Sequence, residues 1–383
     1  MSDIKEFNLI DVRNNSSIVN DLNNVYKLWG YEEISPSFIN DLETIKGREV
    51  IDGDELIGIV SNSSLCLRPE MTTSIVKLTS TRLLNKKRPI RLFNSGIVFN
   101  KKQSYKNTFK FQENLQSGIE LISYDTQYPE IEVINILFDA IDNINLIESC
   151  NLTLLVSTTK IMDLILFNYK NNNYEEIKKC MVNLDQESLD RLNIDNNDKA
   201  ILKELLFTRG EPAIILKKLK NVYGNNNVIE ELDCLFNTLS KISKKYNIKI
   251  QLDPTYQPHL NLYAGIVFQL ICDNKNVKTI IAKGGRYDEL VRYFNPNEKI
   301  INGIGFTISI DNLRELIVEK SQTKKKVLLL FKDSYLLDKG INEQKALQKK
   351  GIITILYLNP CNENSKANIL MKEHNCTEIQ WIK

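Results

Sequence analysis

The stretches RLFNSGIVF (residues 91–99) and LQSGIELIS (residues 115–123) decide the fold of this chain. In both, apolar residues alternate with small or polar ones, which is the period of a strand with one buried face. Other runs with a strand pattern are LIGIV (56–60), LCL (65–67), KIQLD (249–253), NLYAGIVFQLIC (261–272), VKTIIAK (277–283) and GIGFTISI (303–310). Together they predict an α+β fold built on an antiparallel sheet.

Helical patterns surround these strands. Apolar residues recur at helical spacing from Ser17 to Trp29, before a Gly30 suited to a C-terminal cap, and again from Thr72 to Leu84. Pro129 takes the favoured first-turn position of a third helix, and a fourth begins near Asp311. Between about 159 and 246, amphipathic segments separated by polar turns rich in Asn and Gly predict a helical insertion between two halves of the sheet.

The last part of the chain has a different pattern. After the polar linker SQTKKK (321–326), strand-like and helical runs alternate up to residue 383. Strands alternating with helices favour a small parallel α/β unit. We therefore predict two domains, a core over 1–320 that carries the insertion and a C-terminal unit over 325–383.

Composition excludes several functional classes. The 383 residues are 42% hydrophobic, and the 26% that are charged nearly cancel to +2, which is not the footprint of a nucleic-acid groove. Seven cysteines without a CxxC pair and two histidines, His259 and His374, suggest neither a zinc site nor a disulfide framework. We find no secretion signal, membrane span, Walker loop, nucleophile elbow or complete dinucleotide fingerprint. The expectation is a cytoplasmic protein without metal or cofactor.

Several polar residues stand at predicted strand ends in apolar surroundings. They are Arg68-Pro69-Glu70 with Thr72, Gln116 with Glu120 on one predicted strand, Tyr263, and the GGRYD stretch (284–288). Carboxylates that line a cleft with tyrosines can bind an ammonium group and a small polar ring, because they accept charge-assisted hydrogen bonds. Any one of these residues alone fits an exposed polar position on an alternating strand better than a binding site.

The order of these motifs resembles a known family. LRPEMT (67–72), RLFNSGIVF, LQSGIE (115–120), LYAGIVF (262–268), GGRYDEL (284–290) and GIGFTISIDNL (303–313) are similar, in order and spacing, to the catalytic core of histidyl-tRNA synthetase, a class II aminoacyl-tRNA synthetase. GYEEISPSF (30–38) resembles the dimer-forming motif of that class, with Pro36 as its proline. The resemblance covers about Ile10 to Glu319 and implies a class II synthetase-like sheet flanked by helices. By position, the histidine-recognising side chains correspond to Glu70, Thr72, Gln116, Glu120, Tyr263 and Tyr287.

The departures from the synthetase lie where phosphate would bind. The positions of three synthetase arginines read Asn100, Asn312 and Pro258, and that of an adenine-contacting glutamate reads Lys102. One preorganised donor to a developing phosphate charge is worth about 3 to 4 kcal/mol, so three losses imply well over ~10⁴-fold in rate. The C-terminal unit resembles the start of the synthetase's anticodon-binding domain but stops after the third strand. The resemblance therefore implies a chain without catalytic residues for aminoacylation.

A histidine pocket without activation chemistry, the RPEMT variant and the short tail resemble the regulatory subunit of ATP phosphoribosyltransferase. That family implies a short-form catalytic subunit as partner, a dimer through the synthetase-like core, support of the first step of histidine biosynthesis and feedback inhibition by histidine. No membrane or nucleic-acid partner is expected. Two alternatives stay open: a divergent but active histidyl-tRNA synthetase that uses Lys101 or Lys102 in place of arginine, and a histidine or transfer-RNA sensor with another partner. The pocket could also be an ancestral remnant without affinity.

Overall fold

The structure, a computed structural model, describes residues 6–46, 56–103, 109–123, 128–148, 150–169, 173–257, 263–274, 277–296, 301–317 and 325–383. Contacts divide the chain into two compact units, Met1–Ile317 and Val318–Lys383.

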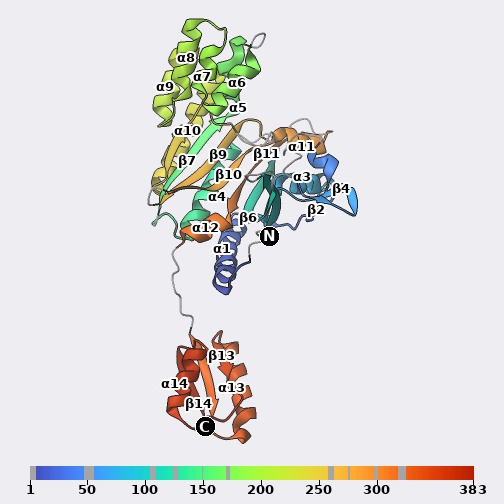
Figure 1. Ribbon diagram of the computed structural model, residues 1–383, viewed down its shortest axis with the longest axis vertical. Helices are drawn as coiled ribbons and strands as arrows, with labels where there is room; N and C mark the ends of the chain where they lie inside the picture. The colour runs from blue at the N-terminus through green and yellow to red at the C-terminus, as the bar shows by residue number, and fades with distance from the viewer. Residues whose placement is uncertain are drawn as a thin grey trace. The chain divides into compact units, whose positions relative to one another are not determined.

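The first unit is built on one large mixed sheet (Figure 1). Its eight strands follow one another in the order β1 (Glu32–Glu33), β5 (Ile90–Gln103), β6 (Phe109–Ser123), β11 (Asn302–Ser309), β10 (Val277–Arg286), β9 (Ile266–Asn274), β7 (Asn151–Thr158) and β8 (Lys249–Leu252). All central neighbours pair antiparallel. The predicted α+β class and the flanking helices are confirmed.

The sheet is not antiparallel throughout, which corrects the prediction at its two edges. β1 runs parallel to β5, and β8 runs parallel to β7. In the second case the helical insertion connects the two strands, and a helical crossover returns the chain in the same direction. Alternating apolar residues identify a strand but do not give the direction of its partner.

The two faces of the large sheet pack against different helices. On one face, α1 (Leu9–Leu28), α4 (Pro129–Asn143) and α12 (Ile310–Leu316) share the main hydrophobic core, which continues into the insertion. On the other face lies a smaller core with α2 (Leu42–Lys46), α3 (Thr72–Thr81) and α11 (Asp288–Phe294). Ile119 of β6 belongs to the main core and Ile122 to the smaller one. Glu120 has the parity of Ile122, so it points toward the smaller core.

The runs LIGIV and LCL are strands of a separate sheet, which corrects the prediction of a single sheet. β3 (Gly58–Ile59), β4 (Asn62–Leu67) and β2 (Ile39–Asp41) form this antiparallel sheet in the order β2-β4-β3. Their alternation is real, but it leaves the choice of partner open because pairing is set by tertiary contacts.

Two helix boundaries differ from the prediction. α1 begins eight residues before the predicted Ser17, because the side chain of Asn8 accepts hydrogen bonds from the N–H groups of Ile10 and Asp11 at 2.9 and 2.8 Å. Leu9, Ile10 and Val12 are exposed, so this first part of the helix has no apolar face that continues the core pattern. α3 ends at Thr81, three residues before the predicted end.

The helical insertion occupies the chain between β7 and β8. Its helices are α5 (Thr159–Leu166), α6 (Tyr174–Asn183), α7 (Gln186–Arg191), α8 (Asn196–Leu206), α9 (Pro212–Tyr223) and α10 (Asn227–Lys245), with a short 3₁₀ turn at Phe167–Tyr169. In Figure 1 the helices α6 to α9 gather beyond the end of β7. No helix in the described ranges is both long enough and apolar enough to cross a membrane.

The second unit is a small parallel α/β sheet in the order β13-β12-β14. Its elements are β12 (Lys326–Phe331), a 3₁₀ turn at Ser334–Leu336, α13 (Leu337–Lys349), β13 (Ile353–Leu356), α14 (Asn364–Glu373) and β14 (Glu378–Ile382). Separate apolar clusters cover the two faces of this sheet.

Candidate functional site

A carboxyl group and a phenol meet inside the smaller core of the first unit. The hydroxyl of Tyr287 donates a short hydrogen bond to Oε2 of Glu120. Only 4% of Glu120 and 1% of Tyr287 are exposed. Gly305 of β11 lies opposite Glu120, and a Cβ there would stand 2.0 Å from Oε2 of Glu120. The carboxyl group therefore occupies space that only glycine leaves free.

Glu70 and Thr72 come to the same place from the start of α3. Both carboxylate oxygens of Glu70, the residue before the N-cap Met71, accept the N–H of Thr73 at 3.1 Å, so Glu70 satisfies a free N–H group in the first turn of this helix. Thr72 is 8% exposed and lies beside both Glu70 and Glu120, close enough to lower the pKa of each carboxyl. One threonine thus stands next to two acidic side chains from separate elements.

Burial changes the protonation of this group of residues. It raises the pKa of the Glu120 carboxyl to about 8; hydrogen bonds from Tyr287 and Thr72 lower that pKa, and the charge of Glu70 raises it. Burial also raises the pKa of Glu70, against the hydrogen bonds from Thr73 and Thr72. Around neutral pH Glu120 is therefore mainly protonated. A cation placed beside it would favour the ionised form.

Tyr263 and Gln116 have different relations to this pocket. Tyr263 is half-buried and lies against Gly285, and burial, followed by the charges of Glu120 and Glu70, raises the pKa of its phenol. Gln116 lies on the same strand face as Glu120, four residues before it, which is roughly 14 Å along the strand. The structure brings five of the six predicted residues together and leaves Gln116 at the far end of the same face.

The four positions that depart from the synthetase pattern are only partly described. Asn100 is half-buried on β5 opposite Gln112, and Lys102 lies two residues further on the same strand. Asn312, in the first turn of α12, donates its side-chain N–H to the carbonyl of Ile280 at 2.8 Å, so it holds α12 against β10. Pro258 and the side chain of Lys102 lie outside the described residues.

Arg68 has a positioning role that the sequence did not reveal. It is 2% exposed and donates hydrogen bonds to the carbonyls of Ile97 and Pro36 at 2.7 and 2.9 Å. Its guanidinium also lies 4.3 Å from the ring centroid of Phe38. Arg68 thus fixes the turn that carries Glu70. Its partners lie 29 to 32 residues away, so no local pattern could indicate them.

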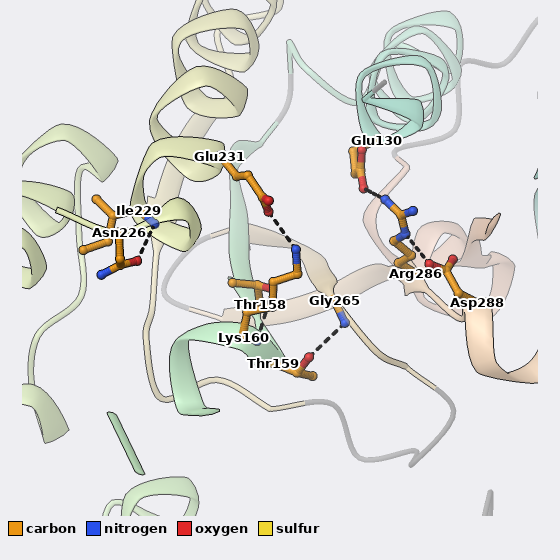
Figure 2. A network of polar contacts seen from close by, with 10 residues as sticks. All are labelled: Glu130, Thr158, Thr159, Lys160, Asn226, Ile229, Glu231, Gly265, Arg286 and Asp288. Carbon is orange, nitrogen blue, oxygen red and sulfur yellow. Dashed lines mark hydrogen bonds and ion pairs between the residues drawn. The ribbon is translucent and has the colours of Figure 1, made fainter. Parts of the chain in front are cut away.

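A second polar network lines a cleft next to this pocket (Figure 2). The cleft has a volume of about 620 Å³, and α10 forms one of its walls. Arg286 pairs with Glu130 and Asp288 at 2.9 and 2.8 Å, and Lys160 pairs with Glu231 at 2.7 Å. The GGRYD stretch indicates Tyr287 by its resemblance to the synthetase motif, but this network is not apparent from the sequence. The sequence signal that could have indicated the network is the charged residue on each side of Tyr287. Neighbouring residues in an extended segment point to opposite faces.

Among the described residues, no group of three or more His, Cys, Asp or Glu side chains is arranged to hold a metal ion.

Comparison with known proteins decides the family. The family model described as histidyl-tRNA synthetase matches residues 3–313. An ATP phosphoribosyltransferase regulatory subunit of Prochlorococcus marinus subsp. pastoris is 98% identical over 383 residues, which is 100% of both chains. The chain belongs to the ATP phosphoribosyltransferase regulatory subunits, which share the histidyl-tRNA synthetase fold. An ATP phosphoribosyltransferase regulatory subunit from a Synechococcus species is 33% identical, over 99% of this chain and 97% of that one.

Solved structures agree on the fold. A protein from Bacillus halodurans described as ATP phosphoribosyltransferase regulatory subunit/histidyl-tRNA synthetase has a TM-score of 0.82 at 20% identity, covering 99% of this chain and 97% of that one. Histidyl-tRNA synthetase from a Nostoc species has a TM-score of 0.77 at 16% identity, covering 97% and 88%. The predictions of a synthetase-like fold and of a non-catalytic regulatory subunit for this phosphoribosyltransferase are confirmed by the family.

Proposed function

We propose that the pocket formed by Glu70, Thr72, Glu120, Tyr263 and Tyr287, with Gln116 at its far end, binds free histidine. Through it the chain would let histidine inhibit the catalytic subunit of ATP phosphoribosyltransferase. The observation that supports this most is the buried Tyr287–Glu120 hydrogen bond, with Thr72 and Glu70 beside it. An α-ammonium group has three donors and no acceptor, and carboxylates are its strongest partners.

The charge balance of the pocket favours such a ligand. A neutral Glu120 can be buried at modest cost, whereas an ionised one needs a cation beside it. The two tyrosines supply ring surface and phenol groups that suit a small polar ring. Asn100 and Asn312, at two positions that would face phosphate, are uncharged, so neither of them supplies a cation for ATP.

The partners follow from the family. The regulatory chain would assemble in the cytoplasm with a short-form catalytic subunit. It would dimerise through the synthetase-like core over 1–320, with the unit over 325–383 as a separate domain. Support for the dimer comes from GYEEISPSF (30–38), which resembles the dimer-forming motif of class II synthetases. Histidine would inhibit by binding one state of the assembly better than the other, and such coupling typically amounts to 5- to 150-fold, or about 1 to 3 kcal/mol.

The experiment is calorimetric titration of the purified chain with histidine at pH 7.5, in two buffers with different ionisation enthalpies. Free imidazole is mostly neutral at this pH. Because the ammonium lowers the raised pKa of Glu120, binding should release a proton, up to about one per site. Absence of binding at millimolar histidine would contradict the proposal. Binding without proton release would contradict the role given to Glu120.

A further inference from the structure

We infer that Arg286 is a positioning residue for the proposed histidine pocket, because its two ion pairs in the neighbouring cleft hold the segment from which Tyr287 reaches Glu120. This inference rests on the proposed function and adds a residue that does not itself line the pocket. Arg286 ends β10, Tyr287 is the next residue, and Asp288 begins α11. Tyr287 points into the smaller core, whereas Arg286 and Asp288 line the cleft.

The ion pairs connect Arg286 to two separate elements. Nη1 of Arg286 lies 2.9 Å from Oε1 of Glu130 on α4, and Nε lies 2.8 Å from Oδ2 of Asp288 on α11 (Figure 2). The side chains of Glu130, Asp288 and Arg286 are 6%, 16% and 23% exposed. A planar guanidinium that uses two of its donors in fixed directions restrains orientation as well as distance.

Backbone hydrogen bonds pass this restraint on to Tyr287. The N–H of Tyr287 donates to the carbonyl of Gly303 at 2.7 Å, and the N–H of Gly303 donates to Oδ1 of Asp288 at 3.0 Å. On the other side, the N–H of Ala264 donates to the carbonyl of Arg286 at 2.8 Å. Asp288 therefore binds both the Arg286 side chain and the glycine that receives the Tyr287 backbone.

The ring of Tyr287 has little freedom in this arrangement. A Cβ on Gly303 would stand 2.3 Å from its Cε2 atom, so the phenol packs directly on that backbone. A shift of Asp288 or Gly303 would displace the hydroxyl relative to Glu120. Displacements of about 1 Å can cost up to 10²-fold in function when geometry matters.

The same cleft offers a matched control. Lys160 and Glu231 form an ion pair at 2.7 Å, but their side chains are 52% and 56% exposed, and no hydrogen bond of this pair reaches Tyr287. Removing the Lys160 charge changes the cleft without loosening the Tyr287 segment. Exposed pairs of this kind contribute little to stability.

The test compares Arg286→Met/Glu130→Gln with Lys160→Met. The double substitution removes the Arg286 charge together with that of Glu130, its more deeply buried partner, while Asp288 keeps the hydrogen bond from the N–H of Gly303. We expect it to weaken histidine binding at least about tenfold, with Arg286→Lys in between and Lys160→Met unchanged. If Arg286 acts through Tyr287, adding the double substitution to Tyr287→Phe should cost little beyond Tyr287→Phe alone. Unchanged affinity, an equal loss in Lys160→Met, or fully additive losses would overturn the inference.

A second measurement keeps the inference separate from the proposed function. Without histidine, the backbone amide of Tyr287 should exchange hydrogen faster in Arg286→Met/Glu130→Gln than in the parent chain, and Lys160→Met should match the parent. If the parent binds no histidine, the proposed function fails, while faster exchange still supports the positioning role. Equal exchange in all three chains would contradict it.

Discussion

Glu120→Gln is expected to weaken histidine binding by about 10- to 100-fold without unfolding the chain, because a hydrogen bond to a charged group is worth roughly 1.5 to 3 kcal/mol. Glutamine keeps the size of the side chain and an oxygen that can accept the Tyr287 hydroxyl, but it cannot become an anion beside an ammonium group. Calorimetric titration measures the loss. Glu113→Gln is the matched control, since Glu113 is exposed on the same strand. Unchanged affinity in Glu120→Gln would place the histidine site elsewhere.

The same substitution should make the empty chain more stable at high pH. The pKa of Glu120 is about 8 in the folded chain, against 4.5 for an ordinary glutamate. Below pH 4.5 both states are protonated, and between about 4.5 and 8 the folded state retains a proton that the unfolded state releases. The parent therefore loses stability as pH rises through this window, by roughly 1.4 kcal/mol per pH unit at most. Glutamine does not titrate, so urea unfolding should show a Glu120→Gln advantage at pH 8 that is absent at pH 4; an equal difference at both would contradict the raised pKa.

The second large effect concerns ATP. The purified chain should exchange pyrophosphate into ATP with histidine at a rate more than about 10⁴-fold below that of a histidyl-tRNA synthetase. Asn100 and Asn312 carry no charge where arginines would meet phosphate, and Asn312 is held by the carbonyl of Ile280. An active histidyl-tRNA synthetase in the same assay is the control.

Lys101 and Lys102 differ in how well either could replace the missing arginine at Asn100. Lys101 points to the opposite strand face from Asn100, and its Nζ lies 4.7 Å from the ring centroid of Phe109. Lys102, two residues after Asn100 in the sequence, is therefore the one to test. Clear exchange that disappears in Lys102→Ala would contradict the non-catalytic account and favour a divergent synthetase.

Two different sequence features predicted the strands of the large sheet and the residues of the pocket. The strands follow from the alternation of apolar residues, as in RLFNSGIVF. Glu70, Glu120 and Tyr287 were predicted from the order of the motifs, and the structure shows that they meet, although they lie 50 to 217 residues apart. No local pattern could give that proximity.

What the sequence missed depends on partners that are distant along the chain. Arg286 binds Glu130 across 156 residues, and Arg68 binds the carbonyl of Pro36 across 32. The prediction of strand pairing was wrong for the same reason. LCL has the pattern of a strand of the large sheet, but its strand pairs with β2 and β3. The Asn8 cap was missed since the turn that it starts is exposed and lacks an apolar face.

The most direct test of the account is phosphoribosyl transfer by a short-form catalytic subunit co-purified with this chain, measured with and without histidine. The account predicts that the chain increases the transfer rate and that histidine then lowers it. In an assembly with Glu120→Gln, the rate should remain while the response to histidine is lost. If the chain neither increases transfer nor changes its response to histidine, the claim that it senses histidine for this enzyme is contradicted.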